Sequence, residues 1–286
     1  MSGPRLVESR SALSAALHEL RGRDRTIALV PTMGALHEGH RTLLLRAAEL
    51  ADDVVVSIFV NPLQFAPGED LARYPRTLDA DLEMCTEQKV ALVFSPGEGD
   101  MFPAGQPEVR VSAGILGSIL EGAARPGHFD GVLTVVAKLF GLVHPDVAVF
   151  GDKDAQQLVL VRQMVSDLDL PVRIESVPVF RDADGLAVSS RNRYLDADAR
   201  RTAVAFSEAI AAARQSSSAG PAAARAAASV VLTSRAGLHL DYCVLVRPDN
   251  LSDLDPGAPS GLLLLAGVVD GTRLIDAALI EMGRPR

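Results

Sequence analysis

The segment from residue 26 to residue 50 restricts the possible folds more than any other part of the chain. Its first five residues, 26–30, are apolar or β-branched and predict a buried strand. The letters PTMG interrupt this strand, and from Leu36 onward apolar residues recur at the spacing of a helix. A strand that leads into a helix through a glycine-containing turn is typical of the start of a nucleotide-binding α/β unit. The segment therefore predicts an α/β domain with a Rossmann-like parallel sheet.

Two histidines, His37 and His40, lie at the start of this helix with Gly39 between them. A spacing of three residues places both rings on one side of the first turn. Backbone N–H groups and the positive end of the helix dipole favour a phosphate there, and Gly39 lets a nucleotide approach the backbone. We predict that the rings donate to ATP phosphates and stabilise the charge that develops as phosphate is displaced. A metal site and an ordinary polar surface are the alternatives, although no third ligand cluster accompanies the pair.

Length and composition set limits on the class of protein. The chain has 286 residues, 48% hydrophobic and 22% charged, as expected for a soluble globular protein with two domains. A net charge of −8 without a basic run argues against nucleic acid as a partner. Cys85 and Cys243 match no metal or redox spacing, which favours a reducing, cytoplasmic compartment. We see no signal-peptide pattern and no apolar stretch of membrane-spanning length, so we expect no membrane partner.

Two further apolar runs end in polar residues that we expect at the same crevice. Residues 54–60 predict a strand covered on both faces, and Gln64 follows the end of this strand. Open α/β sheets bind ligands beyond the carboxyl ends of their strands, so Gln64 should lie near His37. Residues 146–150 predict another buried strand, after which Lys153 would act as a point charge for phosphate. A solvated loop amide and a solvated lysine in a capping turn are the alternatives.

The second half of the chain contains a candidate phosphate clamp, Ser189-Ser190-Arg191. Two short hydroxyl donors and a forked guanidinium suit a phosphate group, although the same three residues occur in many ordinary loops. Arg125 and His128, in the earlier stretch RPGH, would suit an anionic substrate. An arginine that anchors a loop fits Arg125 equally well, so both interpretations stay open at this point.

Several of these stretches resemble one family. His37-Glu38-Gly39-His40 is similar to the HxGH signature of the nucleotidyltransferase superfamily, and PTMGALHEGH resembles the pantothenate synthetase (pantoate–β-alanine ligase) family, as do RPGHF and GDKD. With the Ser-Ser-Arg stretch, the resemblance covers nearly the whole chain. It implies ATP-dependent condensation of (R)-pantoate with β-alanine through a pantoyl-adenylate. The products would be pantothenate, AMP and diphosphate, in coenzyme A biosynthesis. It also implies Mg²⁺ that bridges the phosphates, and a homodimer.

The resemblance also assigns roles to individual residues. His37, His40, Lys153 and Arg191 would be catalytic, with His40 as the proton donor described for the family. Gln64 and Gln157 would bind pantoate, and Gln64 would also contact β-alanine. The chain departs from the common family pattern at three of its positions, with Asp152 for Glu, Phe180 for Val and Val188 for Met. The residues that would contact ATP are Met33, Gly34, Ala35, Leu36, His37, Glu38, Gly39, His40, Gly151, Asp152, Lys153, Asp154, Phe180, Val188, Ser189, Ser190 and Arg191.

The remaining patterns suggest two domains. We expect a Rossmann-like domain over residues 1–179 that binds ATP and pantoate, and a smaller α+β C-terminal lid domain over residues 180–286. Two other functions stay open, a nucleotidyltransferase that leaves the nucleotide on its product and a nucleotide-binding module without catalysis. The predicted helices cover residues 8–20, 78–88, 132–143, 196–213 and 222–232. The further predicted strands cover 90–94, 172–179, 240–246, 262–269 and 272–280, and we predict a loop over 95–106.

Overall fold

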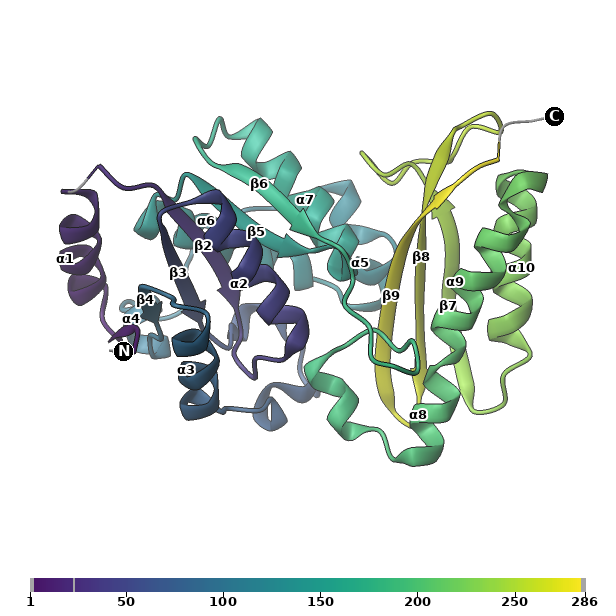
Figure 1. Ribbon diagram of the computed structural model, residues 1–286, viewed down its shortest axis with the longest axis horizontal. Coiled ribbons are helices and arrows are strands. Elements are labelled where there is room, and N and C mark those ends of the chain that lie inside the picture. The colour runs from purple at the N-terminus through teal and green to yellow at the C-terminus, as the bar shows by residue number, and fades with distance from the viewer. Residues whose placement is uncertain (1–2, 23, 284–286) are drawn as a thin grey trace. The chain divides into compact units, whose positions relative to one another are not determined.

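The computed structural model describes residues 3–22 and 24–283, which form two compact units. The first unit comprises the chain up to Phe150 together with Leu160–Val177. The second comprises Gly151–Val159 and the chain from Pro178 onward. Figure 1 shows a separate sheet for each unit. The assignment of functions to residues 1–179 and 180–286, with the second part as a lid, stays a prediction.

A six-stranded sheet forms the centre of the first unit, in the order β1-β4-β3-β2-β5-β6. The neighbouring pairs from β1 to β5 run parallel, as predicted, and β3 is buried along its whole length. The chain order reverses between β2 and β5, which is where open α/β sheets bind ligands. The strands are β1 (Arg5–Val7), β2 (Ile27–Thr32), β3 (Asp53–Ile58), β4 (Leu92–Phe94), β5 (Val147–Gly151) and β6 (Arg173–Val177).

Helices connect these strands, and α1, α3 and α6 lie close to the predicted ranges 8–20, 78–88 and 132–143, although α6 begins earlier, at His128, and α5 was not predicted. Helix α2 packs on β2 and β3, and α6 packs on β2 and α1 (Figure 1). One short helix, α4, lies inside the stretch 95–106 that we predicted as a loop, because one helical turn leaves no periodicity to detect. The helices are α1 (Arg10–Arg21), α2 (Glu38–Leu50), α3 (Leu78–Glu87), α4 (Glu98–Met101), α5 (Glu121–Ala124), α6 (His128–Val143) and α7 (Ala155–Asp167).

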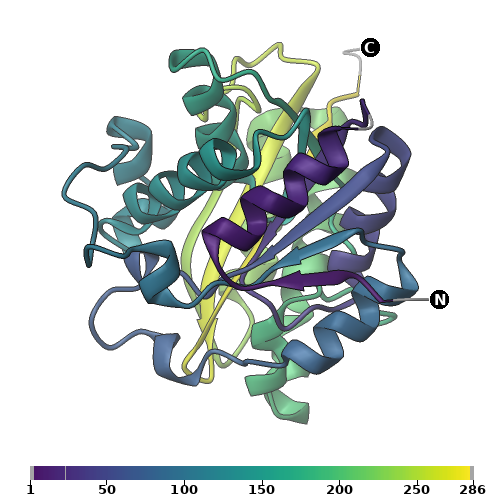
Figure 2. The same cartoon turned by 90° about the vertical axis from the view of Figure 1, so that its left-hand side faces the viewer.

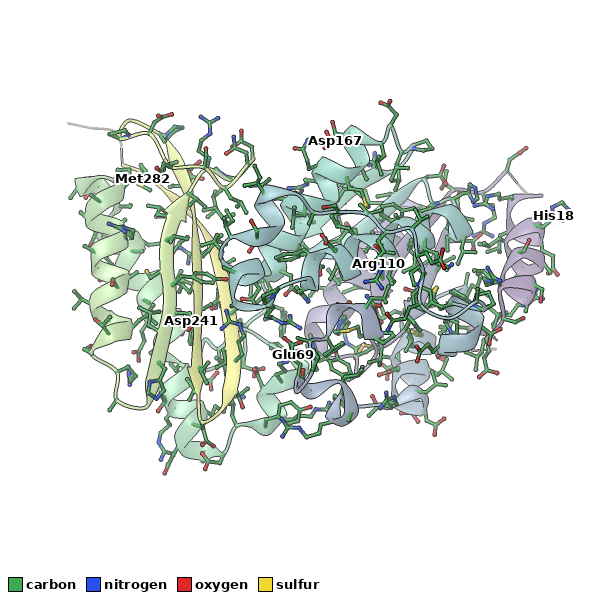
Figure 3. All side chains as sticks on the ribbon, turned by 180° about the vertical axis from the view of Figure 1, so that it is seen from behind. His18, Glu69, Arg110, Asp167, Asp241 and Met282 are labelled. Atoms are coloured by element: carbon green, nitrogen blue, oxygen red, sulfur yellow. The ribbon has the colours of Figure 1, made fainter. Side chains whose placement is uncertain are left out.

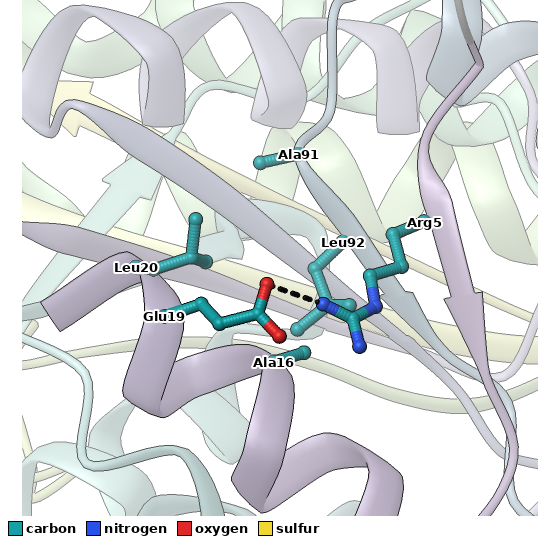
Figure 4. A pocket seen from close by; sticks show the side chains of 6 residues that line it. All are labelled: Arg5, Ala16, Glu19, Leu20, Ala91 and Leu92. Atoms are coloured by element: carbon teal, nitrogen blue, oxygen red, sulfur yellow. Dashed lines mark hydrogen bonds and ion pairs between the residues drawn. The ribbon is translucent and has the colours of Figure 1, made fainter. Parts of the chain in front are cut away.

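The edge strand β1 has no counterpart in the sequence prediction. Its three residues pair in parallel with β4, as Figure 2 shows beside α1. The guanidinium of Arg5 donates to Glu19 of α1 at 2.8 Å, across a small pocket between the strand and the helix (Figure 4). The strand is therefore held by a partner strand far away in the chain and by an ion pair, and neither is visible as a local pattern.

The second unit combines an antiparallel sheet with helices. Its strands β7 (Leu238–Val246), β8 (Ser260–Val269) and β9 (Thr272–Glu281) form a meander close to the predicted ranges. Helices α8 (Ala197–Ala203), α9 (Ala205–Ser216) and α10 (Pro221–Thr233) supply a core rich in alanine. The single helix predicted over 196–213 is wrong, since it divides at Val204. Among the described helices, none is long and apolar enough to cross a membrane.

Candidate active site

The two histidines lie together at the start of α2, as predicted. His37 is the N-cap residue, and the centroids of the His37 and His40 rings are 4.1 Å apart. The backbone N–H of His37 donates to Nδ1 of His40 at 3.2 Å. Because Nδ1 accepts this bond, a neutral His40 carries its proton on Nε2 and presents Nε2–H as a donor. The N–H of His37 is thus used inside the turn, and the role of the imidazole toward phosphate stays a prediction.

Gln64 is oriented by a buried asparagine that sequence reasoning missed. Asn61, 2% exposed, accepts from the N–H of Leu63 at 3.0 Å, so its amide nitrogen is the group that donates to Gln64 Oε1 at 2.9 Å. The Nε2 of Gln64 then points toward Met33, with its nitrogen 3.2 Å from the sulfur. Gln64 and the turn before α2 therefore meet, as predicted, and Gln64 turns its N–H groups toward the turn. The position of Asn61 directly after a buried strand was the available signal.

Arg125 anchors the loop that carries Gln64, which decides between the two interpretations of this side chain. Its guanidinium binds Glu69 through two hydrogen bonds of 2.9 and 2.6 Å, and it donates to the backbone carbonyl of Gln64 at 3.2 Å. Glu69 is labelled in Figure 3. The side chain of Arg125 is only 11% exposed, so its charge is directed into the protein. These bonds tie the short helix η1 (Pro62–Gln64) and the loop after it to the segment between α5 and α6.

His128 completes this network as a neutral ring. Its Nδ1 lies 2.9 Å from the carbonyl oxygen of Gln64, so Nδ1 must donate, and Nε2 then accepts from Arg125 at 3.2 Å. Burial, and next the charge of Arg125, lower the pKa of His128 to about 4. Burial would raise the pKa of Glu69, but the hydrogen bonds and charge of Arg125 outweigh it and lower that pKa. The network is therefore an ion pair beside an uncharged imidazole.

In the second unit, Lys153 lies in a 3-10 turn, η4 (Asp152–Asp154), that links β5 to α7. Its side chain is 20% exposed, and its ammonium lies 3.9 Å from Asp154. The turn packs against β9, and Gln157 follows on the first turn of α7, half-buried. The turn that carries Lys153 therefore packs on the sheet of its own unit, and the role of the lysine toward phosphate stays a prediction.

The Ser-Ser-Arg stretch follows a hairpin of the same unit. The N–H of Val188 donates to the carbonyl of Phe180 at 3.0 Å, and Gly185 makes the tight return with a φ of +88°. Ser189 caps the short helix η5 (Ser190–Tyr194) by accepting from the N–H of Arg191, and η5 also contacts β9. Arg181 fixes the hairpin through two hydrogen bonds, 2.7 and 2.8 Å, to the buried Asp276 of β9. Both segments that we predicted to contact ATP, 151–154 and 188–191, therefore belong to turns that pack against β9.

The described residues contain no group of three or more His, Cys, Asp or Glu side chains that could hold a metal ion. Within the part of the chain that the structure describes, the interpretation of the histidine pair as a metal site therefore gains no further ligands.

The parallel sheet, together with the two histidines at the start of α2, places the chain in the class of α/β enzymes with a Rossmann-like fold. A sequence profile described as "Pantoate-beta-alanine ligase" matches residues 5–279. The chain belongs to the pantoate–β-alanine ligase family, whose members are acid–amine ligases named pantothenate synthetases.

Individual relatives extend over nearly the whole chain. The pantothenate synthetase of Nocardioides sp. is 51% identical over 99% of this chain and 87% of its own length. That of Acidothermus cellulolyticus is 53% identical over 96% of this chain and 90% of its own length. The crystal structure of pantothenate synthetase from Thermus thermophilus superposes with a TM-score of 0.91 at 43% identity, over 96% of this chain and 98% of that one. The crystal structure of the Francisella tularensis enzyme, complexed with β-γ ATP and β-alanine, superposes with a TM-score of 0.81 at 33% identity, over 98% of this chain and 99% of that one.

Proposed function

We propose that the protein joins (R)-pantoate to β-alanine through a pantoyl-adenylate, with release of AMP and diphosphate, as a step of coenzyme A biosynthesis. The observation that carries this proposal is the pair of histidines at the carboxyl end of β2, beside the reversal of strand order. Nucleotides bind at such positions of open α/β sheets. ATP and β-alanine, the ligands named for the Francisella enzyme, are both substrates of the proposed reaction.

The adenylate is needed because a carboxylate does not react with an amine, since the leaving group would be oxide. In the first step an oxygen of the pantoate carboxylate attacks the α-phosphorus of ATP, and diphosphate leaves. In the second step the amine of β-alanine attacks the activated carbonyl carbon, AMP leaves, and the amine loses a proton. Such a reaction depends mainly on alignment of the reactants and on neutralisation of charge.

The proposal divides the contacts with ATP between two sets of residues. His37 and His40 would donate N–H groups to the departing diphosphate. The bond from the N–H of His37 to Nδ1 of His40 supports this role, because it leaves the proton of a neutral His40 on Nε2. Lys153 would supply a positive charge, and Ser189, Ser190 and Arg191 a clamp for phosphate. The backbone segments 33–40 and 151–154, with Phe180 and Val188, would contact the rest of the nucleotide.

Gln64 and Gln157 would hold pantoate by neutral hydrogen bonds. Gln64 supports this role through the direction of its amide, because Asn61 occupies Oε1 and leaves Nε2–H to donate to an oxygen of the substrate. Gln64 would also contact β-alanine. Mg²⁺ would enter with ATP as MgATP and bridge its phosphates. We further propose, from the resemblance to the family, that the enzyme is a cytoplasmic homodimer.

The test is the release of AMP and diphosphate from ATP and pantoate, with and without β-alanine. We expect diphosphate with pantoate alone in a single turnover, and AMP in multiple turnovers only when β-alanine is added. Diphosphate without AMP under both conditions would indicate a nucleotidyltransferase, and binding of ATP with neither product would indicate a silent module.

A further inference from the structure

The turn between β2 and α2 has an unusual backbone. Gly34 and Ala35 both have left-handed conformations, with φ of +80° and +52°, and Ala35 is buried. A left-handed conformation is unfavourable for alanine, so contacts with the rest of the protein must hold the turn in place. The N–H groups of residues 34–37 all donate to side chains. Gly34 donates to Thr32 Oγ1 at 3.1 Å, and Ala35 and Leu36 donate to Asp81 Oδ2 at 3.0 Å and Oδ1 at 2.8 Å. His37 donates to His40 Nδ1 at 3.2 Å.

Asp81 supplies two of these four acceptors from a distant part of the chain. It lies on α3, is 2% exposed, and also accepts from the hydroxyl of Thr77 at 3.2 Å. A Cβ added to Gly34 would lie 3.0 Å from Asp81 Oδ2, so the carboxylate fits closely beneath the turn. Both carboxylate oxygens accept from the protein, which gives Asp81 a role in fixing backbone rather than in contacting a ligand.

The histidines continue the segment that Asp81 holds. Leu36, whose N–H binds Asp81, directly precedes His37, and the N–H of His37 in turn binds the ring of His40. A rotation of the peptide plane at Leu36 would therefore move His37 and remove the bond that sets the tautomer of His40. We propose that Asp81 is a positioning residue, which acts on the reaction through His37 and His40. This inference rests on the proposed function of the two histidines.

The first experiment compares Asp81→Asn with Asp79→Asn. Asp79 lies on the same helix, outside the contacts with the turn, so its replacement makes the same change of charge without touching the turn. At saturating ATP and pantoate, Asp81→Asn should slow single-turnover formation of the adenylate by about tenfold or more, because its amide turns an N–H group toward one of the turn's donors. Asp79→Asn should stay within about twofold of wild type. Equal rates for wild type and a folded Asp81→Asn variant would overturn the proposal.

A double-mutant cycle with His40→Ala separates positioning from general loss of stability. If Asp81 acts through the ring of His40 as well as through His37, Asp81→Asn should cost clearly less in the His40→Ala background than in the wild type. The full loss in that background would contradict a role through the ring. Should Asp81→Asn not fold, Thr77→Val, which removes the hydroxyl donor to Asp81, takes its place. A loss of about threefold that becomes smaller in the His40→Ala background supports the proposal, and an unchanged rate overturns it.

A second readout needs no substrate and distinguishes this inference from the proposed function. In ¹⁵N spectra of the histidine rings, His40 of the wild type should be protonated on Nε2, and the Asp81→Asn variant should show a mixture of both tautomers. An unchanged tautomer in the folded variant would overturn the positioning role. Failure of the wild type to form an adenylate would refute the proposed function, and the ring spectra would still decide about Asp81.

Discussion

Acidification should destabilise the protein through the buried imidazole of His128. The fold lowers the pKa of this ring from 6.5 to about 4. Between these values the unfolded chain binds a proton at His128 and the folded protein does not, so the free energy of unfolding falls as the pH falls. A shift of this size corresponds to about 3 kcal/mol, at about 1.4 kcal/mol for each tenfold change in proton affinity. The contribution is complete above pH 6.5 and lost progressively down to about pH 4.

The measurement is urea unfolding, followed by circular dichroism because the chain has no tryptophan, at a series of pH values between these limits. His128→Asn removes the titrating group and keeps an N–H donor for the carbonyl of Gln64. The difference between wild type and variant should shrink by about 3 kcal/mol toward pH 4. His18→Asn serves as the control, because His18 is exposed on α1 (Figure 3). A constant difference across the whole range would show that His128 is not held neutral by the network.

Three further substitutions test other parts of the site. Lys153→Ala should slow adenylate formation by roughly a hundredfold, about 3 kcal/mol, with little change in unfolding, and near-wild-type single turnover would refute its role. Gly131→Ala should destabilise the protein by about 3 kcal/mol and weaken pantoate binding, since its Cβ would lie 2.2 Å from the carbonyl oxygen of Leu63. In the control variant Gly141→Ala, on the same helix, the added Cβ meets no described atom within 4 Å, so this variant should be slightly more stable than the wild type. His40→Gln, which can place an N–H near the position of Nε2, should retain more of the adenylation rate at saturating ATP than His40→Ala, and equal rates would argue against a donor role.

The sequence was sufficient for the elements whose pattern is local. The strand and helix around residues 26–50 were predicted because burial on both faces of a sheet and on one side of a helix leaves characteristic spacings. The antiparallel strands of the second unit were predicted for the same reason. The predicted break at Pro31 is wrong, since β2 continues through Pro31 to Thr32. Short elements such as β1 and α4 escaped, because three or four residues contain no period. The division of one predicted helix at Val204 also left no breaker residue in the sequence.

The side chains that orient the site were harder to predict than those proposed to contact substrates. His37 and Gln64 follow strand ends and match family motifs, so their positions are readable. Asn61 and Asp81 act by binding backbone groups, and the partners of Asp81 lie 45 and 46 residues away. Such pairs depend on the packing of α3 beside the turn and leave no spacing rule in the sequence.

The left-handed conformation of Ala35 has a consequence for synthesis on the ribosome. A left-handed alanine costs about 1–2 kcal/mol, and the bonds that offset this cost come from Asp81, 46 residues later in the chain. A nascent chain that ends before α3 lacks this acceptor, although it already contains β2, α2 and both histidines. Chains fold as their segments emerge, from the N-terminus onward. The turn before α2 should therefore take its final shape only after α3 has left the exit tunnel, so an unfinished chain does not yet contain the completed turn.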